Sequence, residues 1–232
     1  MIILRKSTDR GHANHGWLDS HFTFSFADYH DPAFMGFRNL RVINEDVVSP
    51  GRGFGTHGHK DMEIVTWVLS GALRHQDTIG EGGLLRPGDA QHMSAGTGLR
   101  HSEFNASDTD TVHFLQIWLL PKTSGITPNY DQRHFPVAEE RNLLHQLASP
   151  DGRDNSLAWN ADSRLYATRI DPADKVEHAL ASKHAWVQLA RGSATVNGQP
   201  MAQGDGLALT DEIEVAIQAG PDGVEALVFE LS

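Results

Sequence analysis

Short runs of alternating hydrophobic and polar residues make up most of the chain, and turns rich in glycine and proline separate them roughly every eight to twelve positions. Alternation with a period of two places successive side chains on opposite faces of a strand. Closely spaced turns between such runs are typical of sandwiches and barrels. We therefore expect an all-β fold, with strands over residues 39–48, 63–69, 100–104, 112–120, 185–189, 212–218 and 224–231.

Helix is a minority element in this pattern. Only residues 31–36 and 137–147 favour it, and both segments are short. The second is ambiguous, because residues 142–147 are equally compatible with a strand. We expect at most a few short helices.

A faint repeat relates the two halves of the chain. Trp67 begins a run that ends at Gly71 and precedes a Gly-Asp turn, and Trp186 begins a similar run that ends at Gly192 and precedes another Gly-Asp turn. Duplication of one β-barrel would explain this similarity. We expect two domains, residues 1–135 and 136–232, divided near the start of a polar stretch.

Charge and composition exclude several classes of function. The chain has 19 Lys and Arg against 30 Asp and Glu, a net charge of −11, so we expect no nucleic-acid partner. It has no cysteine, which excludes disulfides, thiolate zinc sites and cysteine nucleophiles. No apolar run approaches the roughly 20 residues that span a bilayer, and the first residues do not resemble a secretory signal. We expect a cytoplasmic protein without a membrane partner.

Two pairs of potential metal ligands occur in the first half, where most of the 14 histidines lie. His57 and His59 are two positions apart, as are His101 and Glu103, so each pair shares one face of a strand. If the strands are neighbours, three imidazoles and one carboxylate surround one point. This donor set suits iron, manganese, nickel, copper, cobalt or zinc and leaves coordination positions open.

The competing interpretation is that these are ordinary surface histidines in a histidine-rich chain. Two pairs with the same spacing, each preceded by glycine turns, favour the metal site. Among the other histidines, His75, His92 and His113 are the best candidates to line the same barrel. Five side chains are candidates for a pocket above the metal or for plain core: Phe34, Met35, Phe37, Phe54 and Trp118.

Two motifs carry a specific resemblance. The spacing of Gly51, His57, His59, Glu63 and Gly71 resembles the first cupin motif with one extra residue, and His101-x3-Asn105 resembles the end of the second. Beyond them, four segments closely resemble the pirin family: residues 11–20, 23–27, 54–63 and 91–103.

The resemblance implies a bicupin, two antiparallel jelly-roll barrels with one divalent metal ion in the N-terminal barrel, most often iron. By the family pattern its ligands are His57, His59, His101 and Glu103. Other cupins use the glutamate of the first motif, here Glu63, which shares the face of His57 and His59 if the strand has no bulge.

The second barrel is expected to lack metal. His178 and His184 have no histidine partner two positions away. Ile213, Val215 and Ile217 alternate where the second motif would lie, which suggests an apolar interior.

The activity implied is that of a quercetin 2,3-dioxygenase, which opens the heterocycle of a flavonol with O2 and releases carbon monoxide. Removal of the flavonol hydroxyl proton needs a base, for which Glu103 and Glu63 are the candidates. The partners would be the flavonol and O2, and we expect a monomer. The alternative is a non-enzymatic pirin that acts as a redox-sensitive regulator through protein contacts. A sugar isomerase ranks last, because residues 37–120 contain only Lys60 as lysine.

Overall fold

The computed structural model describes residues 1–232 and is built from strands and two single-turn 3-10 helices, with no α-helix. The all-β prediction is confirmed, and each of the seven expected strands overlaps an observed one. No helix is long and apolar enough to cross a membrane. In chain order the elements are β1 (Ile2–Arg5), η1 (Ser7–Asp9), β2 (Gly11–Asn14), β3 (Leu18–Phe22), β4 (Leu40–Val48), β5 (Gly53–His59), β6 (Glu63–Ser70), β7 (Leu73–Asp77), β8 (Gly82–Leu85), β9 (Asp89–Ser94), β10 (Leu99–Asn105), β11 (Val112–Leu119), β12 (Asn129–His134), β13 (His145–Ser149), η2 (Arg153–Asn155), β14 (Leu157–Ala158), β15 (Ser163–Ile170), β16 (Lys175–Ala179), β17 (His184–Val196), β18 (Gln199–Ala202), β19 (Gly206–Thr210) and β20 (Glu214–Leu231).

Both expected helices are wrong. Residues 31–36 form turns in which the Asp31 carboxylate accepts a hydrogen bond from the amide of Ala33, so a local side-chain bond replaces a helical one. In 137–147, Asn142 has a φ of 61°, which interrupts a right-handed helix. Its side chain bonds Asp171 and Asp174, and the chain then extends into β13.

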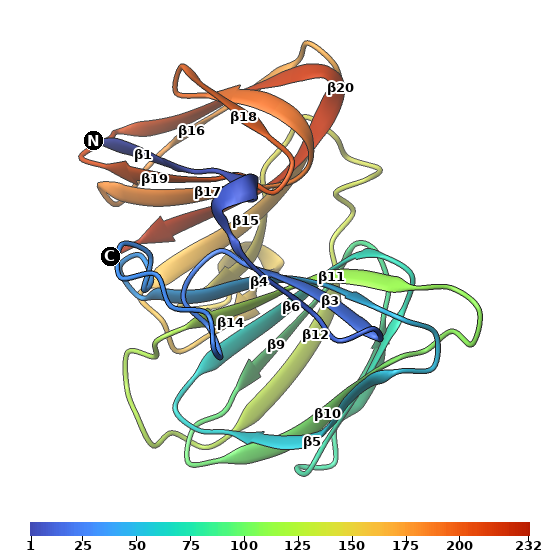
Figure 1. The fold of residues 1–232 in the computed structure, drawn as a ribbon. Coiled ribbons are helices and arrows are strands. Elements are labelled where there is room, and N and C mark those ends of the chain that lie inside the picture. The colour runs from blue at the N-terminus through green and yellow to red at the C-terminus, as the bar shows by residue number, and fades with distance from the viewer. The chain divides into compact units, whose positions relative to one another are not determined.

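One compact unit comprises Gly11–Phe135 together with Trp159–Ala161. Its larger sheet has the order β12-β9-β6-β11-β4-β3-β2, and its smaller sheet has the order β5-β10-β7-β8. Figure 1 shows β5 and β10 side by side, apart from the layer that contains β6 and β9. We call this unit the first barrel.

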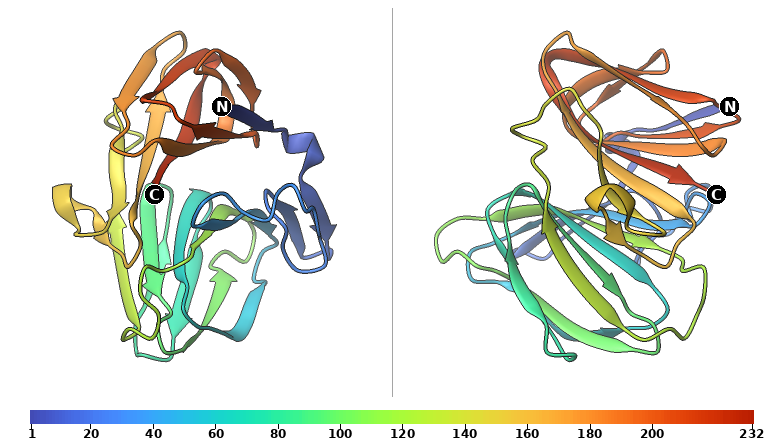
Figure 2. Two further views of the ribbon diagram at one scale, coloured as in Figure 1. Left: turned by 90° about the vertical axis from the view of Figure 1, so that its left-hand side faces the viewer. Right: turned by 180° about the vertical axis from the view of Figure 1, so that it is seen from behind.

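The other unit comprises Met1–Arg10, Pro136–Ala158 and Asp162–Ser232, and we call it the second barrel. Its main path runs β1-β19-β17-β20-β15-β13-β14, with β16 on β20 and β18 on β17. The first strand, blue in Figures 1 and 2, lies beside the orange and red strands of the chain's end, since Ile2 pairs with Leu209 and Arg5 with Gly206. The first ten residues, which the sequence analysis grouped with the first half, thus belong to this unit.

The strand register gives the internal repeat a structural form. Trp67 on β6 stands opposite Ala90 on β9 and Leu115 on β11. Trp186 on β17 stands opposite Ala208 on β19 and Phe229 on β20. Both indoles are almost fully buried. The two barrels therefore share one strand order around equivalent tryptophans.

The interiors of the barrels differ in how completely apolar side chains fill them. A single continuous cluster of buried residues fills the second barrel, and it includes Val176, Val196, Val215 and Ile217. The first barrel has two smaller clusters, around Phe114 and around Ile64. Polar residues and histidines occupy much of the remaining interior.

Candidate metal centre

Strands β5 and β10 bring the predicted ligand pairs together. They pair antiparallel, with His101 directly opposite His57, and the register shifts between His101 and Glu103. Gly53 permits this close approach, because a Cβ there would collide with the backbone carbonyl oxygen of Glu103. The predicted neighbourhood of the two pairs is what the structure shows.

The three histidines point their Nε2 atoms at one another. His101 Nε2 lies 2.9 Å from His59 Nε2 and 3.0 Å from His57 Nε2. Two nitrogens in neighbouring octahedral positions, at metal–nitrogen bonds of about 2.1 Å, are also about 3.0 Å apart. The separations therefore fit one shared cation, and these imidazoles would hold it.

Burial favours the neutral form of two of these imidazoles, those of His59 and His101. Desolvation, with a smaller contribution from His57, lowers the pKa of His59 to about 4. Desolvation and the neighbouring histidines lower the pKa of His101 to about 2. A neutral imidazole has a lone pair for a metal at physiological pH, whereas a protonated one does not.

Glu103 joins this centre through His101. His101, Glu103 and His75 form a second trio whose ligand atoms lie within 4.8 Å of one another, as do those of His57, His59 and His101. Each of the four predicted ligands thus belongs to one of two trios that share His101, and Glu103 is grouped with His75 and His101 but not with His57 and His59. Burial raises the pKa of Glu103 to about 7, despite hydrogen bonds from Gln116 and Thr66 that favour its charged form.

Glu63 does not share the face of His57 and His59, because the strand is interrupted between them and the condition of an unbroken strand is not met. Asp61 has a φ of 48°, which ends the alternation after His59, and Glu63 begins β6 in the other sheet. Its Oε2 accepts hydrogen bonds from His92 Nε2 at 2.7 Å, the Ser94 hydroxyl at 2.7 Å and the Asn160 amide at 3.1 Å. The carboxylate is a buried structural anchor outside the cavity.

A cavity of about 460 Å³ adjoins the histidines. This volume is within the range that is typical of small-molecule binding sites. His57, His59 and Glu103 line it, together with Phe54 and Trp118, two of the five side chains that were candidates for either a pocket or the core. Phe34, Met35 and Phe37 are not part of its wall. The remaining aromatic lining residues, which the sequence analysis did not name, are Trp17, Phe22 and Phe26.

Sequence analysis also missed the polar residues of this cavity. Asn44 and Asp46 lie two apart on β4, and Ser20 and Gln116 face them from neighbouring strands. The Ser20 hydroxyl donates to Asp46, and burial raises the pKa of Asp46 to about 7. The available signal was Asn44-Glu45-Asp46, three polar residues between the hydrophobic pairs 42–43 and 47–48, of which the first and third share a face of the strand.

Of the three further histidines considered, His75 alone reaches the metal centre. Its Nδ1 lies 3.4 Å from His101 Nδ1, and desolvation lowers its pKa. His92 bonds Glu63, and His113 bonds Glu45 at 2.9 Å. The latter two act as partners of carboxylates.

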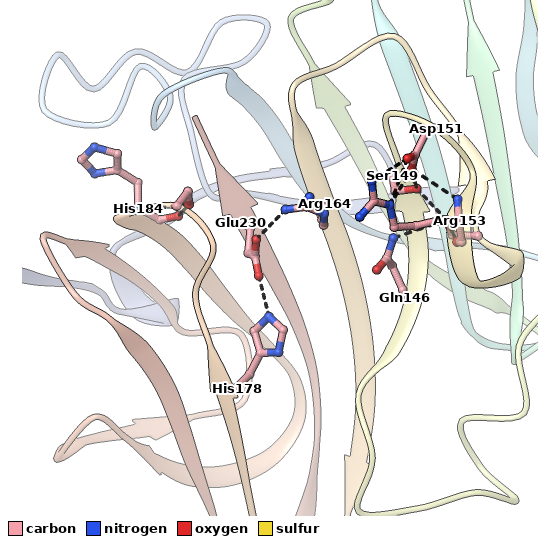
Figure 3. A network of polar contacts seen from close by, with 10 residues as sticks. Gln146, Ser149, Asp151, Arg153, Arg164, His178, His184 and Glu230 are labelled. Atoms are coloured by element: carbon pink, nitrogen blue, oxygen red, sulfur yellow. Dashed lines mark hydrogen bonds and ion pairs between the residues drawn. The ribbon is translucent and has the colours of Figure 1, made fainter.

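In the second barrel, His178 and His184 are far from forming such a centre. Figure 3 shows His178 in contact with Glu230, which also pairs with Arg164 at 3.1 Å, while His184 has no bond to this group. Asp151 and Arg153 make a separate ion pair. Val215 and Ile217 are buried as expected, but Ile213 is 81% exposed and does not contribute to the interior.

Comparisons with known proteins agree across both halves. Residues 4–119 match the pirin family, and residues 146–231 match the quercetinase C-terminal cupin domain. The chain is 50% identical to the quercetin 2,3-dioxygenase of Escherichia coli strain K12, over 100% of this chain and 99% of that protein.

Two solved structures of YhhW from Escherichia coli have the same fold. One is 48% identical with a TM-score of 0.95 and covers 100% of this chain and 98% of that chain. The other is a bacterial pirin in complex with nickel(II), 49% identical with a TM-score of 0.93, and covers 100% of this chain and 99% of that chain.

Proposed function

The chain belongs to the pirin family, and from that premise we propose that it is a metal-dependent dioxygenase that opens the heterocyclic ring of a flavonol such as quercetin with O2 and releases carbon monoxide. One observation carries the proposal: three imidazole Nε2 atoms converge beside an aromatic-walled cavity of about 460 Å³. A planar polyphenol matches that cavity in size and chemistry. The name of the 50% identical relative from Escherichia coli, quercetin 2,3-dioxygenase, supports the same activity.

In this proposal His57, His59, His101 and Glu103 hold one divalent first-row ion per chain. When bound, the ion supplies Lewis acidity that stabilises a deprotonated flavonol hydroxyl. The imidazole and carboxylate donors suit several such ions. Iron is the ion that the sequence analysis predicts, and the nickel complex of a similar protein makes nickel the first alternative to compare.

Glu103 is the proposed base, and its surroundings allow it to take up a proton. The Thr66 hydroxyl lies 2.7 Å from Gln116 Oε1 and 3.3 Å from Glu103 Oε1, and its single proton can serve only one of them at a time. When Glu103 is ionised, Thr66 donates to it. When Glu103 is protonated, it donates to Thr66, which then donates to Gln116.

The second oxygen of Glu103 accepts a hydrogen bond from Gln116 Nε2 at 3.0 Å in either state. The carboxyl group therefore keeps its orientation while it gains or loses a proton. A base that moves little between its two states loses little time or energy to reorganisation.

The aromatic wall would position the substrate and exclude water. His59 packs edge-on against Trp118 at a centroid distance of 4.9 Å, and Trp17 packs against Phe54 at 5.4 Å. These rings place an apolar surface directly beside the proposed ligands. A flat aromatic substrate would stack or pack against them, with its polar edge toward His59 and Glu103.

The test is oxygen uptake and carbon monoxide release with a panel of flavonols. Chain stripped of metal is reloaded separately with Fe²⁺, Ni²⁺, Cu²⁺, Mn²⁺, Co²⁺ or Zn²⁺, and each sample is assayed at matched metal content. We expect stoichiometric release of carbon monoxide with at least one ion. Full metal loading without turnover of any flavonol would refute the dioxygenase and favour the regulatory alternative.

A further inference from the structure

A chain of buried side chains leads away from the proposed metal ligands to Asp77. Asp77 and His75 lie on β7, which pairs with β10, and His101 is directly opposite Asp77 in that register. The side chains of His75 and Asp77 are completely buried. Neither is a ligand in the proposed quartet.

The orientation of the Asp77 carboxylate is fixed from one side. Its Oδ1 accepts hydrogen bonds from the backbone amides of Ile79 at 3.0 Å and Glu81 at 2.9 Å. This leaves Oδ2 facing His75, at 3.5 Å from Nε2. Neither Oδ2 nor Nε2 makes a hydrogen bond in the structure, so each is the nearest candidate partner of the other.

The proton of a neutral His75 then has one position that satisfies both atoms. Buried polar atoms are rarely left without a partner, and only a proton on Nε2 can be shared with Oδ2. His75 Nδ1 is consequently an acceptor. It faces His101 Nδ1 at 3.4 Å, which must therefore be the donor.

We propose that Asp77 and His75 are positioning residues that hold His101 in the tautomer with its proton on Nδ1. The tautomer leaves a bare Nε2, which is the atom that faces His57 and His59. Ligating histidines generally donate their other ring N–H to a partner that fixes the tautomer and ring orientation. Here that partner is a second imidazole, itself fixed by a carboxylate.

The stacking of Tyr130 supports this role. Its ring lies 4.9 Å from the ring of His75 at an interplanar angle of 24°, which restricts rotation of the imidazole. A His75 ring that cannot rotate presents Nδ1 to His101 continuously. The inference rests on the metal site proposed above, but the tautomer can be measured without metal and without activity.

Asp77→Asn gives an unusual expected result. The oxygen of the new amide must stay toward the two backbone amides, because an amide nitrogen accepts no hydrogen bond. Its NH2 group then faces His75 Nε2, which becomes the acceptor. His75 donates from Nδ1, and His101 is left with its proton on Nε2, the tautomer that cannot bind metal there.

We expect Asp77→Asn and His75→Leu each to weaken binding of Zn²⁺ or Ni²⁺ by about 10–100-fold. His75→Asn keeps an oxygen acceptor where Nδ1 was, so it should restore most of the affinity lost in His75→Leu. His134→Gln is the matched control, because His134 pairs with Asp89 in the same barrel but is exposed. It should bind both ions as the parent does.

Long-range proton–nitrogen NMR of ¹⁵N-histidine-labelled, metal-free protein reports the tautomer directly. We expect the proton of His101 on Nδ1 in the parent and on Nε2 in Asp77→Asn. A parent His101 with its proton on Nε2 would overturn the proposal, and so would parent-like metal affinity in Asp77→Asn. If that variant fails to fold, the parent spectrum and the His75 pair still decide. Absence of any metal binding by the parent would refute the metal site instead.

Discussion

The two barrels share one arrangement of strands, but only the first gathers metal-binding side chains. The sheet β12-β9-β6-β11-β4-β3 corresponds to β1-β19-β17-β20-β15-β13. The smaller sheet has the order β5-β10-β7-β8, and its counterpart in the second barrel has the order β16-β20-β17-β18. The first part of β20 takes the place of β10, and the last part of β17 takes the place of β7. Fold alone therefore does not determine whether a barrel has a site.

The difference lies in the side chains at matched positions. In the first barrel His57 stands opposite His101, whereas in the second His178 stands opposite Val215. His178 contacts Glu230 and packs against Tyr166 instead of meeting other imidazoles. Both the ligands and the space that a substrate needs are replaced by apolar packing.

The two barrels also differ in whether their long strands are continuous. In the second barrel β17 and β20 run unbroken through both layers, as strands of 13 and 18 residues. In the first, residues 71–72 separate β6 from β7, and residues 106–111 separate β10 from β11. These interruptions make the sheet that carries the proposed ligands a separate four-stranded layer.

The largest expected effect is that of removing a histidine from the first barrel, compared with removing one from the second. His57→Ala or His101→Ala should abolish stoichiometric metal binding and flavonol oxygenation, because each removes one of three converging nitrogens. His178→Ala should leave metal content unchanged. Metal analysis after dialysis checks this, and equal losses in both barrels would contradict a site confined to the first.

Glu103→Gln should reduce oxygenation by the ~10²–10⁴-fold that is typical of losing a general base, while part of the metal is retained through the amide oxygen. Glu63→Gln should leave turnover per bound metal close to that of the parent, because Glu63 bonds His92 and Ser94 outside the cavity. Metal content and oxygen uptake at saturating flavonol distinguish them. A larger loss of oxygenation in Glu63→Gln than in Glu103→Gln would identify Glu63 as the base.

The packed interior of the second barrel should be the more sensitive to truncation. Ile217→Ala should lower the free energy of unfolding by about 2–5 kcal/mol, because it leaves a cavity in a continuous apolar cluster. Ile213→Ala, at an exposed position of the same strand region, should change it by less than about 0.5 kcal/mol. Denaturant titration of both variants measures the two free energies of unfolding. Equal losses at Ile217 and Ile213 would contradict the prediction.

A smaller, pH-dependent effect on the free energy of unfolding is expected at Asp46 in the first barrel. The apolar interior of the second barrel has no such carboxylate. Burial raises the pKa of Asp46 from the ordinary value of 3.8 to about 7 in the folded state, so the contribution of this side chain to the free energy of unfolding is greatest below pH 3.8 and is lost as the pH rises toward 7. Asp46→Asn should therefore stabilise the metal-free protein increasingly between pH 4 and 7, by at most about 1.4 kcal/mol for each unit of pKa difference.

Unfolding measurements on chelated parent and Asp46→Asn at several pH values test this. Above pH 7 the difference should level off. A difference that does not change with pH would show that the carboxylate is not desolvated in solution.

Sequence alone predicted the long hydrophobic strands and the neighbouring ligand pairs, because both depend on local alternation. It missed four-residue strands such as β8 and β18, which are too short to show a clear alternation. It also divided β20 at Gly220 and Pro221. The strand continues because β17 pairs with Ala219 and then Val224, so Pro221 lies where the ladder needs no N–H.

The role of Glu63 was beyond sequence analysis for a similar reason. The parity argument assumes an unbroken strand from His57, and one left-handed residue, Asp61, invalidates it. His75 was recognised as a candidate, but its contact with His101 depends on the pairing of β7 with β10. Long-range pairing therefore limits what local patterns reveal of the site.

The pairing of β1 with β19 has a consequence for the order in which the molecule forms during synthesis. Residues 11–135 emerge early and contain every strand of the first barrel, whereas Ile2–Arg5 must wait for Gly206–Thr210 before their ladder exists. Until then the nascent chain carries an unpaired apolar segment at its beginning, the kind of edge that invites aggregation. Ile2–Arg5 are thus translated long before the strand they pair with, and a bulky group fused just ahead of them would delay completion of the second barrel.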